Sequence, residues 1–489
     1  MLNSLIAASL ALVPWPHEVE VRTGSIPQTS PVVVVADATI PAEGYVLDIS
    51  PTGTVTIACS DAAGAFYARQ TLGQLAVGTN DYACARVTDR PAYRWRGLLI
   101  DEGRHFFGKD VLKRTLDVMA QHKLNVLHWH LTEDQGWRLD VPGYPELVKY
   151  GAVRAASPRY GARLRQTVQG DCEMDLDGQP YGPYFYTASD VKEILDYAAE
   201  RHIKVVPEID LPGHVFSALA AYPAFACFPE NLAKRTPRLV WGVEKDVLCV
   251  GNDKAIRFME DILDFVCRLF SSDVIHLGGD ECPQDRWKAC PKCQKRIRDE
   301  GLGGEKDLQP WITRHFVKFL AARGRRVLGW DECLLGTNVP QSVLGMTRWH
   351  ERPGKGRAWQ SPSDLAAKGH DVVMAPNVFT YLDYAQGLED DPFQYIGGCV
   401  TLEKCHSLNP CAGVPADLRS RILGGQGSCW SEYTWNKFDL EWKTWPRACA
   451  LAEVFWSGAD KPSFDDFLGR MRVHRKRLIR QGVNCAPLD

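Results

Sequence analysis

The sequence lacks long hydrophobic runs, a dominant charge of either sign, and a serine or cysteine nucleophile motif. No stretch of its 489 residues reaches the about 18 consecutive apolar side chains that a membrane span needs, so we expect no transmembrane segment. The formal net charge of -3 provides no basic field, so we expect no nucleic-acid partner. With 45% hydrophobic and 24% charged residues, the composition is that of a globular protein large enough for one large α/β domain and a smaller one.

The N-terminus also lacks a basic residue ahead of its apolar run, Leu5 to Val13. That run is either the remnant of a signal peptide or the first strand of the protein, since the alternating Val19-Glu20-Val21 follows closely. Sixteen cysteines are compatible with disulfides and therefore with export. We expect an exported protein, periplasmic, on the outer surface or secreted, with its signal peptide absent or trimmed.

A Cys-x-x-Cys motif, Cys290 to Cys293, follows Cys282 and resembles half of a zinc site. A structural zinc site normally needs four ligands, and no fourth follows at the spacing of a zinc finger. We therefore expect a disulfide or buried thiols at these positions, and neither a metal nor a cofactor in the protein.

The chain divides into two parts by its pattern. Residues 1–92 predict a small α/β domain, with strands at 31–36, 44–49 and 54–58 and a helix at 62–75. Residues 93–489 alternate apolar runs with helix-length segments, which indicates parallel βα units and predicts a (β/α)8 TIM barrel with enlarged loops. The eight expected strands are 98–100, 124–131, 204–209, 274–277, 326–329, 342–346, 371–375 and 422–429. The expected helices are 110–122, 188–201, 252–270, 308–323, 362–369 and 441–455.

Acids, histidine, arginine and tryptophan collect directly after these runs, at the end of the barrel where such enzymes carry their active sites. The fourth run is followed by Gly278 and Gly279 and then by two adjacent acids, Asp280 and Glu281. The glycines permit an unusual backbone at the strand end, and the two acids repel each other, so their pKa values should separate. Taken alone, the stretch is equally compatible with an acidic cap at a helix N-terminus.

Carboxylates, an arginine and several of the fifteen tryptophans suit a carbohydrate, because tryptophan faces pack well on the apolar side of a sugar ring. An ordinary glycosidase places two carboxyl groups roughly 5 to 9.5 Å apart across the scissile bond. Sequence neighbours such as Asp280 and Glu281 fit that geometry poorly. Substrate-assisted hydrolysis, in which no enzyme carboxylate is the nucleophile, is the alternative.

Stretches along nearly the whole chain resemble glycoside hydrolase family 20, the exo-acting β-N-acetylhexosaminidases. They are residues 96–106, 128–138, 207–214, 276–281, 329–332, 381–383 and 430–432. The resemblance implies a retaining enzyme that removes terminal β-linked GlcNAc or GalNAc from glycans or chito-oligosaccharides. In the implied mechanism, the 2-acetamido oxygen of the substrate attacks C1 and forms an oxazolinium ion.

The resemblance also implies roles for individual residues. Asp280 would accept the acetamido N–H, Tyr381 would aim the acetamido oxygen, and Glu281 would act as general acid and then general base, with a raised pKa. Glu133 and His214 would hold Glu281, and Asp210 is expected in the same supporting layer. The expected sugar-binding residues are Arg104, Trp330, Trp349, Asp383, Trp430 and Glu432.

Two other functions stay open at this point. The pair His128 and His130 after a barrel strand also resembles the metal ligands of amidohydrolases, which need further His and Asp ligands on later strands. A non-catalytic sugar-binding protein on the same barrel is the second alternative, because a fold alone does not establish activity.

Overall fold

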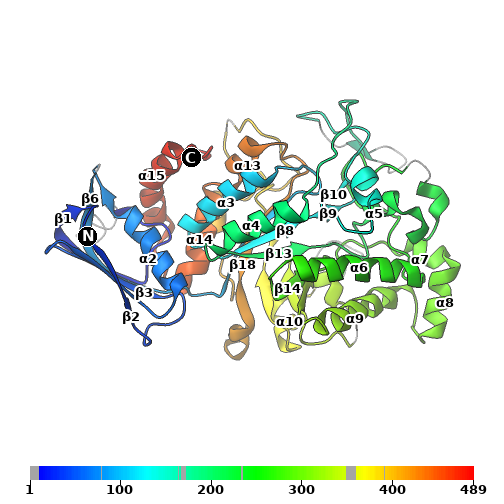
Figure 1. Ribbon diagram of the computed structural model, residues 1–489, viewed down its shortest axis with the longest axis horizontal. Coiled ribbons are helices and arrows are strands. Elements are labelled where there is room, and N and C mark those ends of the chain that lie inside the picture. Colours follow the sequence, from blue (N-terminus) through cyan, green and yellow to red (C-terminus); the bar gives the residue numbers. More distant parts are fainter. Residues whose placement is uncertain are drawn as a thin grey trace.

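The computed structural model describes residues 10–78, 80–162, 165–166, 172–232, 235–336, 338–348, 360–389 and 391–488. An N-terminal sheet lies at one end of the molecule, a barrel occupies the middle, and helices α6 to α9 lie at the far end (Figure 1). The C-terminal helix α15 returns to the side of the barrel that faces the sheet (Figure 1).

The N-terminal sheet has the strand order β1-β6-β3-β4-β2, with β5 beside β6. Buried and half-buried residues alternate along β3 and β4, and α2 packs its Tyr67 and Leu72 onto the buried face. The strands expected at 31–36, 44–49 and 54–58 and the helix at 62–75 are confirmed, whereas the pattern missed β6. The elements are β1 (Glu18–Pro27), β2 (Val32–Ala36), β3 (Tyr45–Ser50), β4 (Thr54–Cys59), α2 (Ala62–Gln74), β5 (Ala76–Val77) and β6 (Asp81–Asp89).

Eight parallel strands close a barrel, and each of the eight expected apolar runs forms one of them, so the predicted TIM barrel behind a small sheet-plus-helix unit is confirmed. Nearly all residues of the strands are buried, because interior side chains cover one face of the sheet and the helices cover the other. Leu99, Val206, Leu328 and Val373 belong to the interior core. The strands are β7 (Trp95–Asp101), β8 (Val126–His130), β13 (Lys204–Glu208), β14 (Val274–His276), β15 (Arg326–Trp330), β16 (Leu344–Thr347), β17 (Val372–Met374) and β18 (Ile422–Cys429).

Helices surround the barrel, and side-chain caps start several of them. Thr187 and Asp190 form a reciprocal capping box at α4, and Asn252 caps α6. The helices after β6 are α3 (Lys109–Gln121), α4 (Ala188–Ala199), α5 (Phe216–Ala221), α6 (Asp253–Leu269), α7 (Asp285–Ala289), α8 (Pro291–Asp299), α9 (Leu308–Ala321), α10 (Pro362–Ala367), α11 (Asn377–Thr380), α12 (Leu402–His406), α13 (Lys437–Thr444), α14 (Arg447–Ser457) and α15 (Phe464–Arg480). Short strands β9 (Thr132–Glu133), β10 (Gly136–Trp137), β11 (Arg165–Gln166) and β12 (Cys172–Glu173) lie in the loops.

Two expectations about helices and strands need correction. The single helix expected at 441–455 is two helices, α13 and α14, because Pro446 has no N–H to continue the first of them. Of the apolar run 5–13, residues 10–13 are buried without joining a sheet, and the first strand of the described chain is β1; residues 5–9 lie outside the described residues. Across the described residues, no helix is both long and apolar enough to cross a membrane.

A buried ion pair ties the C-terminal helices to the N-terminal segment. Both carboxylate oxygens of Glu453 accept hydrogen bonds of 2.8 Å from the guanidinium of Arg470. The backbone N–H of Trp15 donates to the same carboxylate at 2.9 Å, and Arg470 also donates to the carbonyl of Leu12. Burial alone would raise the pKa of Glu453, but Arg470 and His406 outweigh it and lower that pKa to about 2.

We expect Glu453→Gln to lower the free energy of unfolding at neutral pH by about 3–5 kcal/mol, because it leaves the buried Arg470 charge unpaired. Since the folded pKa lies below the unfolded value, the stabilisation from this carboxylate is present above pH 4.5 and declines as the pH falls toward 2. Urea unfolding followed by circular dichroism should therefore show that the difference in free energy of unfolding between the two proteins becomes smaller below pH 4.5.

The matched control is Asp196→Asn, which breaks an exposed pair with Lys192 and should change stability by less than about 1 kcal/mol. Equal effects of the two substitutions at neutral pH would contradict the assignment of the Glu453 pair as an anchor.

Candidate active site

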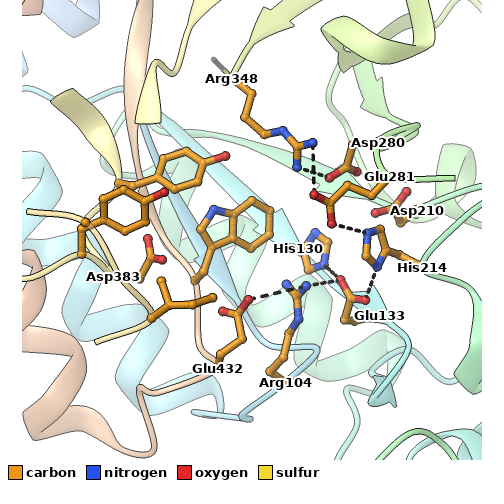
Figure 2. A pocket seen from close by; sticks show the side chains of 16 residues that line it. Arg104, His130, Glu133, Asp210, His214, Asp280, Glu281, Arg348, Asp383 and Glu432 are labelled. Carbon is orange, nitrogen blue, oxygen red and sulfur yellow. Dashed lines mark hydrogen bonds and ion pairs between the residues drawn. The ribbon is translucent and has the colours of Figure 1, made fainter. Parts of the chain in front are cut away.

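A cavity of about 270 Å³ opens at the C-terminal ends of the barrel strands, where barrel enzymes carry their active sites (Figure 2). Its volume lies near the lower end of the range for small-molecule sites. The segments that end or follow seven of the strands contribute to its wall. The lining residues are Arg104, His130, Glu133, Asp210, His214, Asp280, Glu281, Arg348, Tyr381, Asp383, Tyr384, Ile396, Gly397, Gly398, Trp430 and Glu432.

The end of β14 turns sharply to bring both acids to the cavity. Gly278 and Gly279 have φ of +63° and +92°, and a Cβ on Gly278 would lie 1.8 Å from Oδ1 of Asp210. The Asp210 carboxylate accepts the N–H of Gly279 at 3.1 Å. Glu281 itself has a φ of +46°, a left-handed conformation that costs a non-glycine residue about 1–3 kcal/mol. The glycine pair is therefore a requirement of this turn.

A continuous chain of polar contacts crosses the floor of the cavity to Glu281 (Figure 2). Arg104 contacts Glu133 at 2.9 Å, Glu133 contacts Nδ1 of His214 at 2.7 Å, and Nε2 of His214 lies 3.8 Å from the Glu281 carboxylate. The side chain of Glu133 thus reaches His214. Burial alone would lower the pKa of His214, but the carboxylates of Glu133 and Asp134 outweigh it and hold that pKa well above its usual value.

Arg348 and Glu332 have no role in the sequence-based assignment, yet both contact the acidic pair. The Arg348 guanidinium bonds Oδ2 of Asp280 and a carboxylate oxygen of Glu332, each at 2.6 Å, and lies 3.6 Å from Glu281. The other oxygen of Glu332 accepts the Glu281 backbone N–H at 2.8 Å. Both residues lie within two positions of the end of a barrel strand, and Glu332 also belongs to the stretch 329–332 that resembles the family; these are the sequence signals that could have indicated them.

Four buried oxygen atoms of residues that line the cavity find no hydrogen-bond partner among the described residues. They are Oδ1 of Asp280, the hydroxyl of Tyr381, Oδ1 of Asp383 and Oε2 of Glu432. Buried polar atoms are nearly always paired in native proteins, so a cluster of unpaired ones marks a surface suited to a polar ligand. The arrangement can accept and donate hydrogen bonds at several points around one small molecule.

Burial is the leading cause of the shifted acidities in the cavity. It raises the pKa of Asp280, an effect that Arg348 opposes and that the neighbouring Glu281 increases. The expected repulsion between the two acids is therefore present but secondary for Asp280. Burial and then the Glu432 charge raise the pKa of Asp383 well above its usual value, which favours a neutral Asp383 that can donate a hydrogen bond.

Trp330 lies beneath the cavity and does not line it. It is fully buried, its indole N–H donates to Oε1 of Glu208 at 3.1 Å, and its ring lies 5.8 Å from the ring of Trp430, which does line the cavity. The hydrogen bond to the buried Glu208 carboxylate holds the indole of Trp330 in the barrel interior. Trp330 thus supports Trp430 from below, and Trp349 lies outside the described residues. All the other expected site residues line the cavity together.

The histidines that resembled an amidohydrolase pair surround the same Glu208. His128 Nε2 and His276 Nδ1 lie 3.0 and 2.8 Å from its carboxylate oxygens, and His130 Nδ1 lies at 2.5 Å. His128, His276 and Glu208 are fully buried, whereas a catalytic metal keeps a coordination position open to substrate. These histidines therefore hold a buried carboxylate under the cavity.

Carboxylates gathered with arginine and tryptophan around a cavity of this size, at the C-terminal end of a barrel, are the arrangement expected of a glycoside hydrolase of the barrel type. Matches to two domains of one known family make the assignment specific. Residues 93–459 match the catalytic domain of glycosyl hydrolase family 20, and residues 10–90 match domain 2 of the same family. The chain belongs to glycosyl hydrolase family 20.

Individual relatives agree with this assignment. A β-hexosaminidase from Porphyromonas gingivalis is 37% identical over 479 residues, covering 95% of this chain and 57% of the relative. One from Akkermansia muciniphila is 31% identical, covering 97% of this chain and 91% of the relative. The solved structure of an exo β-N-acetylglucosaminidase from Vibrio harveyi in complex with N-acetylglucosamine has a TM-score of 0.83 at 27% identity, covering 98% of this chain and 79% of that one. The chain thus spans little more than half the length of the Porphyromonas relative.

We expect Glu133→Gln to lower the pKa of His214, because the substitution removes the charge that contributes most to holding it up. Titration of the protein labelled at histidine, followed by NMR, should show the His214 imidazole losing its proton at lower pH than in the unmodified protein. The His130 imidazole, which also contacts Glu133 at 3.2 Å, should shift in the same direction, so the test follows the assigned His214 imidazole. Asp383→Asn is the control, since Asp383 lines the same cavity and makes no ion pair with His214. The same titration of this imidazole in all three proteins would show that Glu133 does not set the charge of His214.

Proposed function

We propose that the protein is an exo-acting, retaining β-N-acetylhexosaminidase that removes terminal β-linked GlcNAc or GalNAc through an oxazolinium ion formed by the substrate itself. The observation that carries the proposal is the pair Asp280 and Tyr381, which line the cavity beside Glu281 with an unpaired carboxylate oxygen and an unpaired hydroxyl. An acetamido group has one N–H donor and one carbonyl acceptor, so it complements the two atoms at once.

The proposed first step joins these contacts to bond cleavage. Asp280 accepts the acetamido N–H while the Tyr381 hydroxyl donates to the carbonyl oxygen and aims it at C1. As that oxygen bonds to C1, the glycosidic bond breaks and Glu281 gives its proton to the leaving oxygen. The Asp280 carboxylate, fixed by Arg348, faces the positive charge that develops on the acetamido group.

In the proposed second step, Glu281 takes a proton from a water molecule that attacks C1. The C1–O bond to the acetamido oxygen breaks, the acetamido group is restored, and two inversions at C1 give net retention. His214, which lies between Glu133 and Glu281, keeps a cation beside the carboxylate that forms between the steps. Glu281 thus returns to its acid form after each cycle.

Ring hydroxyls would meet the opposite wall of the cavity. Arg104 lies 3.8 Å from Glu432, and Asp383 and Glu432 each present an unpaired carboxyl oxygen there. Trp430 supplies an aromatic face for the ring. A cavity of about 270 Å³ suits one sugar unit, which supports removal of a terminal residue. The names of the relatives, β-hexosaminidases and an N-acetylglucosaminidase holding N-acetylglucosamine, support an N-acetylhexosamine as that unit.

The requirement for the acetamido group is the main test of this proposal. We expect release of 4-nitrophenol from the β-GlcNAc or the β-GalNAc glycoside and none from the β-glucoside, which lacks the internal nucleophile. Similar turnover of the glucoside would overturn substrate assistance and require a nucleophile on the enzyme. If none of the three is turned over, a non-catalytic sugar-binding barrel or a disaccharide-releasing enzyme replaces this proposal.

The roles of the two adjacent acids can be separated by the leaving group. We expect Glu281→Gln to slow hydrolysis of a chito-oligosaccharide by about 10²–10⁴-fold, because the sugar leaving group needs a proton from the general acid. The loss in the glycosylation step should be much smaller with 4-nitrophenol, a weaker base as a leaving group.

Asp280→Asn is the matched substitution at the neighbouring position. We expect it to slow both substrates by similar factors, since its carboxylate acts on the acetamido group and not on the leaving oxygen. Measuring kcat/KM for both substrates with both variants provides the comparison. If Glu281→Gln lowers kcat/KM by the same factor for both leaving groups, Glu281 is not the general acid.

A further inference from the structure

Four cysteines from three separate segments meet in the interior next to α7 and α8. The cluster consists of Cys227, Cys249, Cys290 and Cys293, and we refer to it as the four-cysteine cluster. All four side chains are buried and are free thiols, and no disulfide joins them. Cys282, the third cysteine of the local sequence pattern, is not a member. Helices α7 and α8, beside the cluster, lie at the end of the molecule opposite the N-terminal sheet (Figure 1).

The sulfur atoms of the cluster are spaced as a tetrahedral metal requires. The Sγ of Cys227 lies 3.8 Å from that of Cys293, and Cys249 Sγ lies 3.8 Å from those of both Cys290 and Cys293. The four sulfurs all lie within 4.8 Å of one another. Four sulfurs at about 2.3 Å from a central zinc ion stand about 3.8 Å apart in a regular tetrahedron. A disulfide would need about 2.05 Å between two sulfurs.

The backbone around the cluster holds the ligands in place before any metal arrives. Ala226 and Leu248 form an isolated antiparallel bridge, which places Cys227 and Cys249 on adjacent segments. Cys290 is the N-cap of α8 and Cys293 stands in its first turn, so both sulfurs lie at the positive end of that helix, which favours thiolates. The indole of Trp287 donates to the Leu248 carbonyl at 2.9 Å and joins α7 to the Cys249 segment.

Gly251 shows how closely these segments approach each other. A Cβ there would lie 2.2 Å from the carbonyl carbon of Lys292 and 2.3 Å from the backbone nitrogen of Cys293. The chain leaving Cys249 therefore packs directly on the peptide between Lys292 and Cys293. Any larger side chain at this position would collide with that peptide, so only glycine fits it.

We propose that the four-cysteine cluster is a structural Zn²⁺ site. Binding converts four thiols to thiolates, releases four protons to solvent, and gives a centre with a charge of -2. No ligand position is left for water or substrate, so the role is structural and not catalytic. Lys292, within the Cys-Pro-Lys-Cys segment, supplies positive charge near Cys249, whereas Arg286 is already paired with the Asp246 carboxylate at 2.8 and 2.9 Å.

The position of the site indicates which parts of the fold the metal would hold together. Cys227 lies on the connection after β13, which carries His214, and Cys290 lies on the connection after β14, which carries Glu281. The inner parts of these connections also touch, since a Cβ on Gly213 would lie 3.2 Å from the Asp280 carbonyl. One zinc ion therefore fastens together the outer parts of the two segments that present the candidate acid and its histidine.

The test is the metal content of the full chain, produced without a polyhistidine tag and dialysed against metal-free buffer. Elemental analysis and native mass spectrometry should find one zinc per chain. Cys293→Ala should lose it, and Cys405→Ala, which removes a buried cysteine outside the cluster, should retain it. These measurements need no substrate, so their outcome does not depend on whether the proposed activity is correct.

Two further measurements keep the proposal open to refutation if Cys293→Ala fails to fold. Replacing the zinc of the unsubstituted protein with Co²⁺ should give intense thiolate-to-cobalt absorption, which the histidines and carboxylates of the cavity cannot produce. Removing the metal with a chelator under reducing conditions should lower Tm, because metal binding is coupled to folding. Free thiols without metal, two disulfides, or iron in place of zinc would each overturn the proposal.

Discussion

The active end of this barrel depends on one constraint, which is that carboxylates removed from water must be matched by donors. Asp101, Glu133, Glu208 and Asp210 are almost completely buried. A buried charge without a partner costs several kcal/mol, so each of them needs histidine, arginine or backbone N–H groups in contact. Glu208 contacts three histidines and the indole N–H of Trp330. Arg104 forms ion pairs with both Asp101 and Glu133.

This constraint explains how the groups around the cavity are positioned before any substrate binds. The groups that would face a sugar are themselves held by a layer of paired charges, and His214 and Glu281 both keep a left-handed backbone that the surrounding contacts must maintain. Donors and charges fixed in advance need no rearrangement when charge develops during reaction, which is the main source of electrostatic catalysis. The pairing of Arg348 with Asp280 belongs to the same layer, because it fixes one oxygen and leaves the other facing the cavity.

The fold could be predicted because parallel barrel strands are covered on both faces and therefore form apolar runs of recognisable length. The strand ends indicated where the site residues would lie, and the resemblance to glycoside hydrolase family 20 implied which of them would act; Asp280, Glu281 and Tyr381 come together at one cavity. The limits of sequence-based prediction lie in contacts across the fold. The break at Pro446 separates two helices that share one apolar pattern, and Trp330 is hydrogen-bonded to Glu208, a partner 122 residues away in sequence, and does not line the cavity.

The cysteines also show that spacing along the sequence misses contacts between distant segments, which only the fold reveals. Spacing along the chain offers only Cys290 and Cys293, since the other two members of the cluster lie far earlier and reach them through the connections after β13 and before α6. Long connections lose much conformational entropy when ordered, so they need anchors away from the barrel. The bridge between Ala226 and Leu248 and the contact at Gly251 provide such anchors, and the proposed zinc ion would add a third. The position of Glu281 is therefore set from two sides, by the glycine turn at the end of β14 and by the fastening of its connection at the far end.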